Sequence, residues 1–171
     1  MAGHYLRAAL IFACVVAFAA PQGARADDPD FLSFGGGYFD WNRQKSPAAE
    51  FRFEYRSDQK FWVFKPLGGL MATSDGAVYA YAGVGIDVFF GRRFVVTPSF
   101  APGYYHKGSG LELGHELEFR SQIEFAYRFD DRSRFGLAIS HISNASIGDT
   151  NPGTEIFSLY YSVPVPKLLG N

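Results

Sequence analysis

Three residues near the end of the chain have the side chains that nucleophilic ester hydrolysis requires: His141, Ser143 and Glu155. In this chemistry the histidine takes the proton of the serine hydroxyl as the serine oxygen attacks a carbonyl carbon. The carboxylate fixes the tautomer of the imidazole and supports its charged form. Just after the serine, the side-chain amide of Asn144 and the backbone N–H of Ser146 are candidate donors to the oxyanion. The residue types therefore predict a catalytic Ser-His-Glu group with its own oxyanion hole.

Residues 135–163 form the element that must position this group. Two alternating runs flank a polar loop with Asn, Asp, Pro and Gly, which predicts a β-hairpin. Alternate residues of a strand share one face, and cross-strand neighbours have Cβ atoms about 4.5–5.5 Å apart. If residues 141–143 pair with Glu155, the three side chains meet. They share their face with apolar residues: Phe135, Leu137, Ile139, Phe157, Leu159, Tyr161 and Val163.

Spacing alone is weak support for catalysis, because His-x-Ser is common in strands. The simpler interpretation is a set of ordinary polar residues at the rim of a barrel. Polar side chains within an apolar stripe are unusual, however, since they are costly against lipid unless they have a role. The group makes sense on a strand face that contacts lipid, and the rest of the chain tests that hypothesis.

The first 26 residues have the organisation of a secretory signal peptide. Met1–Arg7 carries positive charge, Ala8–Ala20 is an apolar run, and Ala24–Ala26 has the small-x-small form of a cleavage site. We expect cleavage before Asp27, which leaves 145 residues (171 minus 26) as a single domain over 27–171. A retained anchor helix is the alternative, although the apolar run is short for one.

Composition narrows the class of protein. The only cysteine, Cys14, falls in the predicted signal, so residues 27–171 have no thiol for a disulfide or a metal. Without Arg7 and Arg25, 14 of the 16 basic residues remain against 17 acidic ones, and no basic tail indicates a nucleic-acid partner. Aromatic residues reach 18 %, and no later stretch has the length of an apolar transmembrane helix. An exported, aromatic-rich chain of this kind indicates a bacterial outer-membrane β-barrel.

Eight alternating segments follow the signal. They are residues 31–41, 49–56, 61–73, 77–90, 94–105 and 115–129 and the two runs of the hairpin. In 115–129 Glu, Arg and Gln alternate with Leu, Phe, Ile and Tyr, which suits a polar lumen and an apolar outer wall. We expect a bulge where Pro66 and Gly68–Gly69 interrupt the third segment, and bulges or missing ladder bonds at Pro98 and Pro102. The pattern predicts an all-β fold, an eight-stranded antiparallel transmembrane β-barrel.

Other interpretations of the pattern stay open. A secreted soluble β-barrel that binds lipid inside would show the same alternation with the faces reversed. A non-enzymatic outer-membrane barrel with a structural or adhesion role would carry the polar group by chance. The chain also ends in Lys167–Asn171, without the aromatic residue on which barrel proteins usually finish. His106 and His115 flank a glycine-rich loop, which we interpret as a solvated loop and not as a metal site.

The hairpin residues resemble a known family. The stretches His141–Ala145, Asn151–Glu155 and the aromatic run 157–161 look like the active hairpin of the lipid A 3-O-deacylases, whose motif is His-x-Ser-Asn with a Glu twelve residues past the serine. The resemblance implies an eight-stranded outer-membrane barrel in which His141, Ser143 and Glu155 are catalytic and Asn144 lies in the oxyanion hole. Where this family often has Gly, the chain has Ser146.

The implied reaction is hydrolysis of the 3-position acyl ester of lipid A in lipopolysaccharide. The enzyme would be a serine esterase that needs no cofactor and no metal and is surrounded by its own substrate in the outer membrane. With the first strand entering from the periplasm, odd strands run outward, and the loop 146–153 is extracellular, level with the outer leaflet. Whether the barrel is a monomer or a homodimer stays open.

Overall fold

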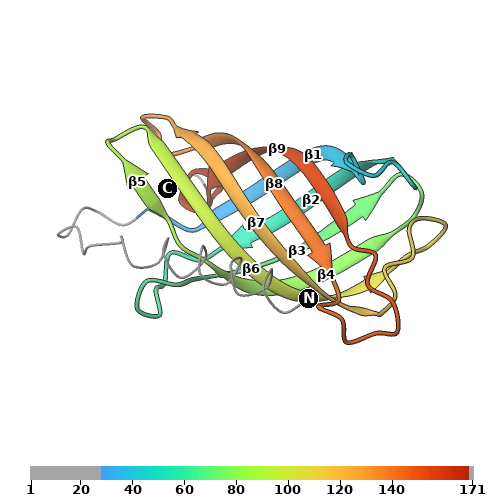
Figure 1. Cartoon of the computed structure of the whole chain (residues 1–171). Coiled ribbons are helices and arrows are strands. Elements are labelled where there is room, and N and C mark those ends of the chain that lie inside the picture. Colours follow the sequence, from blue (N-terminus) through green and yellow to red (C-terminus); the bar gives the residue numbers. More distant parts are fainter. Residues whose placement is uncertain (1–27, 170–171) are drawn as a thin grey trace.

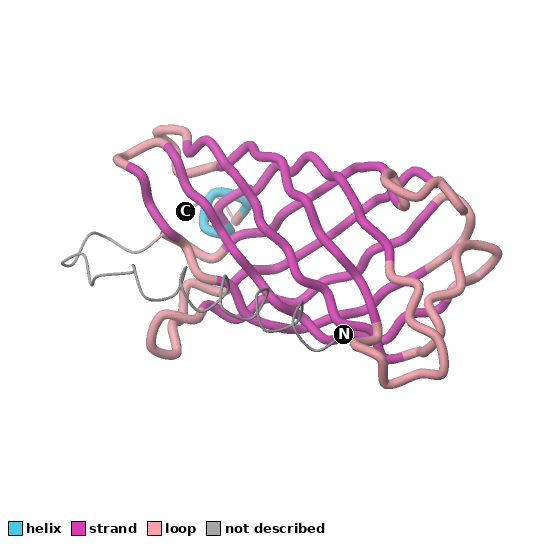
Figure 2. Tube along the Cα trace, viewed as in Figure 1, coloured by secondary structure: helices cyan, strands magenta, loops and turns pink. Residues whose placement is uncertain are grey.

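The computed structural model describes residues 28–169, so the predicted signal peptide, residues 1–26, lies outside the described residues. The described chain is one antiparallel sheet that curls into a barrel, with the longer loops gathered at one end (Figure 1). The strands are β1 (Phe31–Phe39), β2 (Ala48–Arg56), β3 (Lys65–Thr73), β4 (Val78–Gly85), β5 (Val88–Phe90), β6 (Phe94–His106), β7 (Leu117–Arg128), β8 (Arg134–Ser143) and β9 (Thr154–Pro164). The short helix α2 (Val165–Leu168) follows β9 at the opposite end (Figure 2). Within residues 28–169 no helix has the length and apolarity that a membrane span requires.

The barrel closes because β4 pairs with β6 as well as with β3. Around the axis the order is β4-β3-β2-β1-β9-β8-β7-β6, and every pair is antiparallel. β5 continues β4 in the same register on β6, with Gly85 opposite Ser99 and Val88 opposite Val96. Eight strands therefore surround the axis, which confirms the predicted architecture. The predicted strand 77–90 is one strand with an interruption at residues 86–87.

The interruptions in this pairing lie opposite prolines. Residues 82–83 and 86–87 have no ladder partner on β6, where they face the regions of Pro102 and Pro98. Ala82 and Gly83 still pair with β3, and the Ile86 N–H still donates to the carbonyl oxygen of Pro98 at 3.0 Å. A proline has no N–H to donate to the ladder. On its other side β6 pairs with β7 without a break, so β6 is not bulged. We expected either bulges or missing ladder bonds at Pro98 and Pro102, and the structure shows missing ladder bonds.

The glycines of β3 have a different role from the one predicted. β3 keeps one continuous register with both β2 and β4, so the bulge predicted at Pro66 and Gly68–Gly69 is absent and that prediction is wrong. A Cβ atom at Gly69 would lie 2.5 Å from the carbonyl oxygen of Phe53 and 2.7 Å from the hydroxyl of Tyr81. Glycine is therefore required there because neighbouring strands and a lumen side chain approach closely.

The two faces of the barrel wall have opposite chemistry. On β2 the charged residues are buried in the lumen, whereas Phe51 and Phe53 point outward with exposed fractions of 62 % and 42 %. The same alternation runs along β7, where Glu118, Arg120 and Glu124 are buried and the apolar side chains are exposed. This arrangement is that of a membrane barrel, because a soluble barrel would place its apolar face inward. A lumen filled with charged side chains also excludes the soluble lipid-binding barrel.

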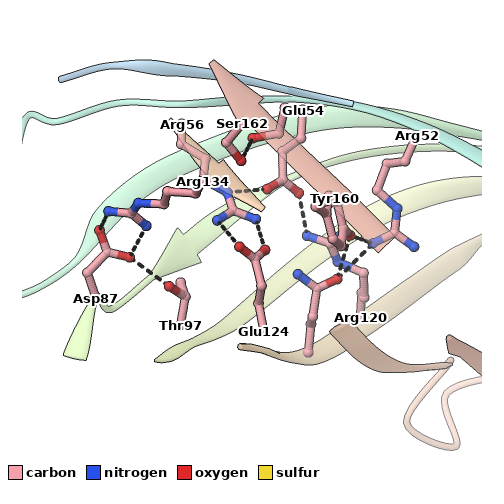
Figure 3. A network of polar contacts seen from close by, with 12 residues as sticks. Arg52, Glu54, Arg56, Asp87, Thr97, Arg120, Glu124, Arg134, Tyr160 and Ser162 are labelled. Atoms are coloured by element: carbon pink, nitrogen blue, oxygen red, sulfur yellow. Dashed lines mark hydrogen bonds and ion pairs between the residues drawn. The ribbon is translucent and has the colours of Figure 1, made fainter. Parts of the chain in front are cut away.

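Buried ion pairs fill the lumen and join strands on opposite sides of it (Figure 3). Glu54 of β2 accepts hydrogen bonds from Arg56 Nε at 2.6 Å, from the Tyr81 hydroxyl of β4 at 2.8 Å and from Arg120 Nη2 of β7 at 2.9 Å. Arg56 also donates two hydrogen bonds to Glu124 of β7. Arg120 and Glu124 of β7 thus form buried ion pairs, whereas the two carboxylate oxygens of Glu118, which is also buried on β7, accept no hydrogen bond from the described residues. Because the charges compensate one another, they hold the barrel wall together across a lumen that excludes the bulk solvent.

A second cluster lies nearer the α2 end of the lumen. Asp87, in the interruption between β4 and β5, accepts hydrogen bonds from Arg134 Nη2 at 2.8 Å and from the Thr97 hydroxyl at 2.7 Å (Figure 3). It also accepts one from Lys65 Nζ at 3.1 Å. Arg134 also binds Asp28, just before β1. The residue that interrupts the predicted strand is thus the one that ties β3, β6 and β8 together.

Removal of the central carboxylate tests whether the lumen network stabilises the barrel. Glu54→Ala leaves Arg56 and Arg120 without a shared partner, and breaking a buried pair in this way costs about 3–5 kcal/mol. We expect the variant to lose its folded, heat-modifiable gel mobility at a clearly lower temperature than the parent protein. Glu116→Ala, which removes an exposed carboxylate just before β7, is the control and should match the parent. Equal unfolding temperatures for Glu54→Ala and the parent would contradict the role given to the network.

Candidate active site

The hairpin of β8 and β9 places His141 and Glu155 side by side. The two residues are direct cross-strand partners, and Nδ1 of His141 lies 3.3 Å from Oε1 of Glu155. Both side chains point outward, in line with the exposed apolar residues of the same strands, and 44 % of the His141 side chain and 21 % of the Glu155 side chain are exposed. A base and an acid of the right kind therefore lie on the outer wall of the barrel, near the end that carries the longer loops.

Ser143 is the last residue of β8 and lies on the same outward face as His141. In the described part of the chain, no hydrogen bond joins its hydroxyl to His141. Hydrogen bonds of this kind are often long or poorly aligned in enzymes without bound substrate. The imidazole uses Nδ1 toward Glu155, which leaves Nε2 as the nitrogen that can serve the serine. The structure thus brings two of the three residues into contact and places the third beside them on the same face.

Gly153 provides the space that the imidazole occupies. Its φ angle is +60°, a conformation that L side chains rarely adopt, and a Cβ atom there would lie 2.9 Å from Cε1 and 3.3 Å from Nε2 of His141. The glycine of the Asn-Pro-Gly-Thr-Glu stretch is therefore needed both for the turn into β9 and for the position of the His141 ring. Sequence reasoning identified it only as a loop residue.

The two predicted oxyanion donors are occupied by contacts within the protein. The fully buried amide of Asn144 donates to the carbonyl oxygens of Leu113 at 3.0 Å and Thr150 at 2.7 Å, and its Oδ1 accepts the Ser146 N–H at 2.9 Å. In this arrangement both residues brace the loop after β8. A role in binding the oxyanion requires these bonds to be exchanged when substrate enters, and it stays a prediction.

An apolar surface borders the serine on the β7 side. Phe119 is the cross-strand neighbour of Ser143, and it stacks on Phe100 of β6 with ring centroids 5.9 Å apart. Ser121, a small outward-facing residue, is the neighbour of His141. The larger rings thus lie beside Ser143, and a small side chain lies beside His141. Such a surface suits an alkyl chain that approaches Ser143 from within the lipid.

The loop between β1 and β2 contacts Glu155 from the β1 side, and sequence reasoning missed it. The Trp41 N–H donates to the carbonyl oxygen of Glu155 at 3.2 Å, and Nε of Arg43 lies 4.0 Å from Oε2 of the same residue. The sequence signal was only a polar connection after the first strand. The contact depends on the pairing of β1 with β9, which joins the first and last strands of the barrel.

Within residues 28–169 no three or more His, Cys, Asp or Glu side chains are grouped so that they could hold a metal ion. In the glycine-rich loop, Lys107 pairs with Glu112 at 2.9 Å, and this hydrogen bond lowers the pKa of the Glu112 carboxyl. The loop is therefore organised by an exposed ion pair of its own.

The chain is similar to one known protein family and to two of its curated members. The family described as lipid A 3-O-deacylase (PagL) matches residues 30–164. The lipid A deacylase PagL of Pseudomonas aeruginosa is 29 % identical over 84 residues, 49 % of this chain and 40 % of that protein. The Bordetella bronchiseptica protein of the same name is 30 % identical over 84 residues, 49 % of this chain and 39 % of that protein. The alignment thus spans about two fifths of the length of these relatives.

Two solved structures share the fold. The crystal structure of the outer membrane enzyme PagL has a TM-score of 0.63 at 19 % identity and covers 79 % of this chain and 99 % of that one. A de novo designed transmembrane β-barrel has a TM-score of 0.57 at 8 % identity and covers 81 % of this chain and 98 % of the design. The closed barrel with its apolar outer wall is a protein of the bacterial outer membrane. With the family matched from residue 30 to residue 164, the chain belongs to the lipid A 3-O-deacylase (PagL) family.

Proposed function

We propose that this barrel hydrolyses the 3-position acyl ester of lipid A by a Ser-His-Glu mechanism, releasing a 3-hydroxy fatty acid. The observation that carries the proposal is the contact of His141 with Glu155 on the lipid-facing wall, with Ser143 next to them on the same face. The lumen holds buried ion pairs, so a lipid substrate meets polar chemistry only from outside. Family membership supports both the reaction and the substrate class.

In the proposed mechanism each side chain takes a role that its position supports. Nε2 of His141 takes the proton of Ser143 as the hydroxyl oxygen attacks the ester carbonyl carbon, while Glu155 stabilises the imidazolium through Nδ1. The tetrahedral intermediate collapses when His141 returns the proton to the sugar oxygen, which leaves as an alcohol. Water, activated by the same histidine, then hydrolyses the acyl-serine and frees the fatty acid. In this proposal the amide of Asn144 and the N–H of Ser146 turn toward the oxyanion as it forms.

The position of the site along the barrel favours lipopolysaccharide as the source of the ester. His141 and Glu155 lie next to the loop 144–153, which is at the end with the longer loops (Figure 1). Outer-membrane barrels have short periplasmic turns and longer extracellular loops. The catalytic group then lies at the height of the outer leaflet, where lipid A presents its ester bonds near the headgroup boundary. No cofactor takes part in these steps, and the oligomeric state, monomer or homodimer, does not enter them.

Replacement of the nucleophile tests the mechanism. Ser143→Ala removes the attacking oxygen, and loss of such a nucleophile costs about 10³-fold or more in rate. We expect release of 3-hydroxy fatty acid from purified lipopolysaccharide to fall by at least that factor, while heat-modifiable gel mobility stays unchanged. Undiminished release from the variant would rule out Ser143 as the nucleophile. Failure of the folded parent protein to release the acid would instead favour the structural or adhesion barrel.

Gly153→Ala tests whether the turn into β9 positions the catalytic ring. The new methyl group meets the imidazole of His141, and because displacement of a catalytic group by about 1 Å can cost about 10²-fold, we expect deacylation to fall by about 10- to 100-fold. Gly91→Ala is the control, because Gly91 has a similar φ of +67° and no atom within 4 Å of the added methyl group. Equal activity of the two variants would show that backbone strain alone, and not the ring position, explains any loss.

A further inference from the structure

Arg43 contacts both the backbone that leads into β9 and the carboxylate that β9 carries. Its Nη1 donates a hydrogen bond to the carbonyl oxygen of Pro152, and its Nε lies 4.0 Å from Oε2 of Glu155. The arginine belongs to the loop between β1 and β2, far from the hairpin in sequence. One guanidinium thus reaches the last turn before β9 and the proposed catalytic acid at the same time.

The two oxygens of Glu155 have different surroundings. Oε1 faces Nδ1 of His141 at 3.3 Å. Oε2 is buried and accepts no hydrogen bond from residues 28–169, so Arg43 provides the nearby positive charge. A buried carboxylate oxygen without a hydrogen bond is costly, and a cation at this distance offsets part of that cost. The arrangement directs one oxygen to the base and the other to the arginine.

The loop that carries Arg43 is itself fixed to β9. Oδ2 of Asp40 accepts the backbone N–H groups of Lys45 at 2.6 Å and Ser46 at 2.8 Å, which closes the loop. Oδ1 of Asp40 accepts the hydroxyl of Thr154 at 3.2 Å, and the Trp41 N–H binds the carbonyl oxygen of the next residue, Glu155. Asp40 and Thr154 are both buried. The backbone on either side of Arg43 is therefore held at a set distance from the acid.

We propose that Arg43 is a positioning residue for the deacylation: its guanidinium holds Oε2 of Glu155 so that Oε1 faces His141. This inference rests on the proposed function. It differs from a role in binding substrate, in which Arg43 would contact an anionic group of lipid A directly. The two roles predict different behaviour toward a reagent that reacts with the serine and has no sugar or phosphate group.

The reagent is a neutral alkyl fluorophosphonate. The serine oxygen bonds to phosphorus, the P–F bond breaks, fluoride leaves, and His141 takes the hydroxyl proton, so the labelling rate reports how well the base and acid activate Ser143. We expect Arg43→Gln to slow labelling about tenfold and Arg43→Lys to restore part of the rate, because loss of the guanidinium lets the Glu155 carboxylate turn away from His141. Lys45→Gln, which removes a charge from an exposed side chain of the same loop, should label at the parent rate.

A Glu155→Gln background separates positioning from a general loss of structure. If Arg43 acts through the carboxylate, Arg43→Gln should change the labelling rate by less than twofold once Glu155 is replaced. On lipid A, Arg43→Gln should lower kcat and leave KM unchanged. Should Arg43→Gln not fold, Arg43→Lys, which keeps the charge without the planar fork, is compared with the parent and should label more slowly.

Two results would overturn the inference. Parent-rate labelling of Arg43→Gln, with slower deacylation of lipid A, would assign the arginine to substrate binding. If Arg43→Gln lowered the labelling rate by the same factor with Glu155 and in the Glu155→Gln background, the arginine would serve the structure of the loop alone. If the folded parent protein does not label on Ser143 at all, the proposed function fails, which is a different outcome from either of these.

Discussion

Along each strand of this closed barrel, side chains point alternately into the lumen and to the outer wall, and the rest of the structure depends on this constraint. Every second residue of each strand faces the lumen, and the chain places Glu, Arg and Tyr there, where they pair across the barrel. The remaining residues form the apolar outer wall. Since the lumen is filled by its own ion pairs, a lipid substrate is excluded from it. Any chemistry on lipid has to be done by polar side chains placed in the outward-facing rows.

The register of one hairpin then determines where that chemistry lies. Pairing of β8 with β9 sets His141 directly opposite Glu155, and the outward face carries Ser143 beside them. Loops from two other parts of the chain stabilise this edge. Asn144 joins the loop after β8 to the loop before β7, while the β1–β2 loop holds Glu155 by its backbone and by Arg43. Strands thus fix the spacing of the group, and loops fix the orientation of its side chains.

Much of this could be predicted from the sequence, because alternation has a period of two and is visible over each segment. The strand count, the polar lumen and the hairpin with its outward-facing group followed from that pattern. Features that depend on packing did not. β3 begins at Lys65 and not at Phe61, because Phe61 and Phe64 bridge across a turn with Trp62 at a φ of +62°. The contact of Arg43 with Glu155 was not predicted for a related reason. Closure of the predicted barrel implies that β1 lies beside β9, but the register that brings the β1–β2 loop to Glu155 depends on packing. Likewise, the type of Asn144 suggested an oxyanion donor, but only the fold shows that two carbonyl groups already use its amide.

The central claim is that a barrel with a closed, charged lumen hydrolyses one ester of its surrounding lipid from the outer wall. Tandem mass spectrometry of lipid A, incubated in detergent with the purified, fully heat-modifiable barrel, tests it most directly. We expect a single product lighter by one 3-hydroxy acyl chain, with the missing chain mapped to the 3-position. Lipid A that keeps all its acyl chains, or that loses a chain from another position, would rule out this reaction.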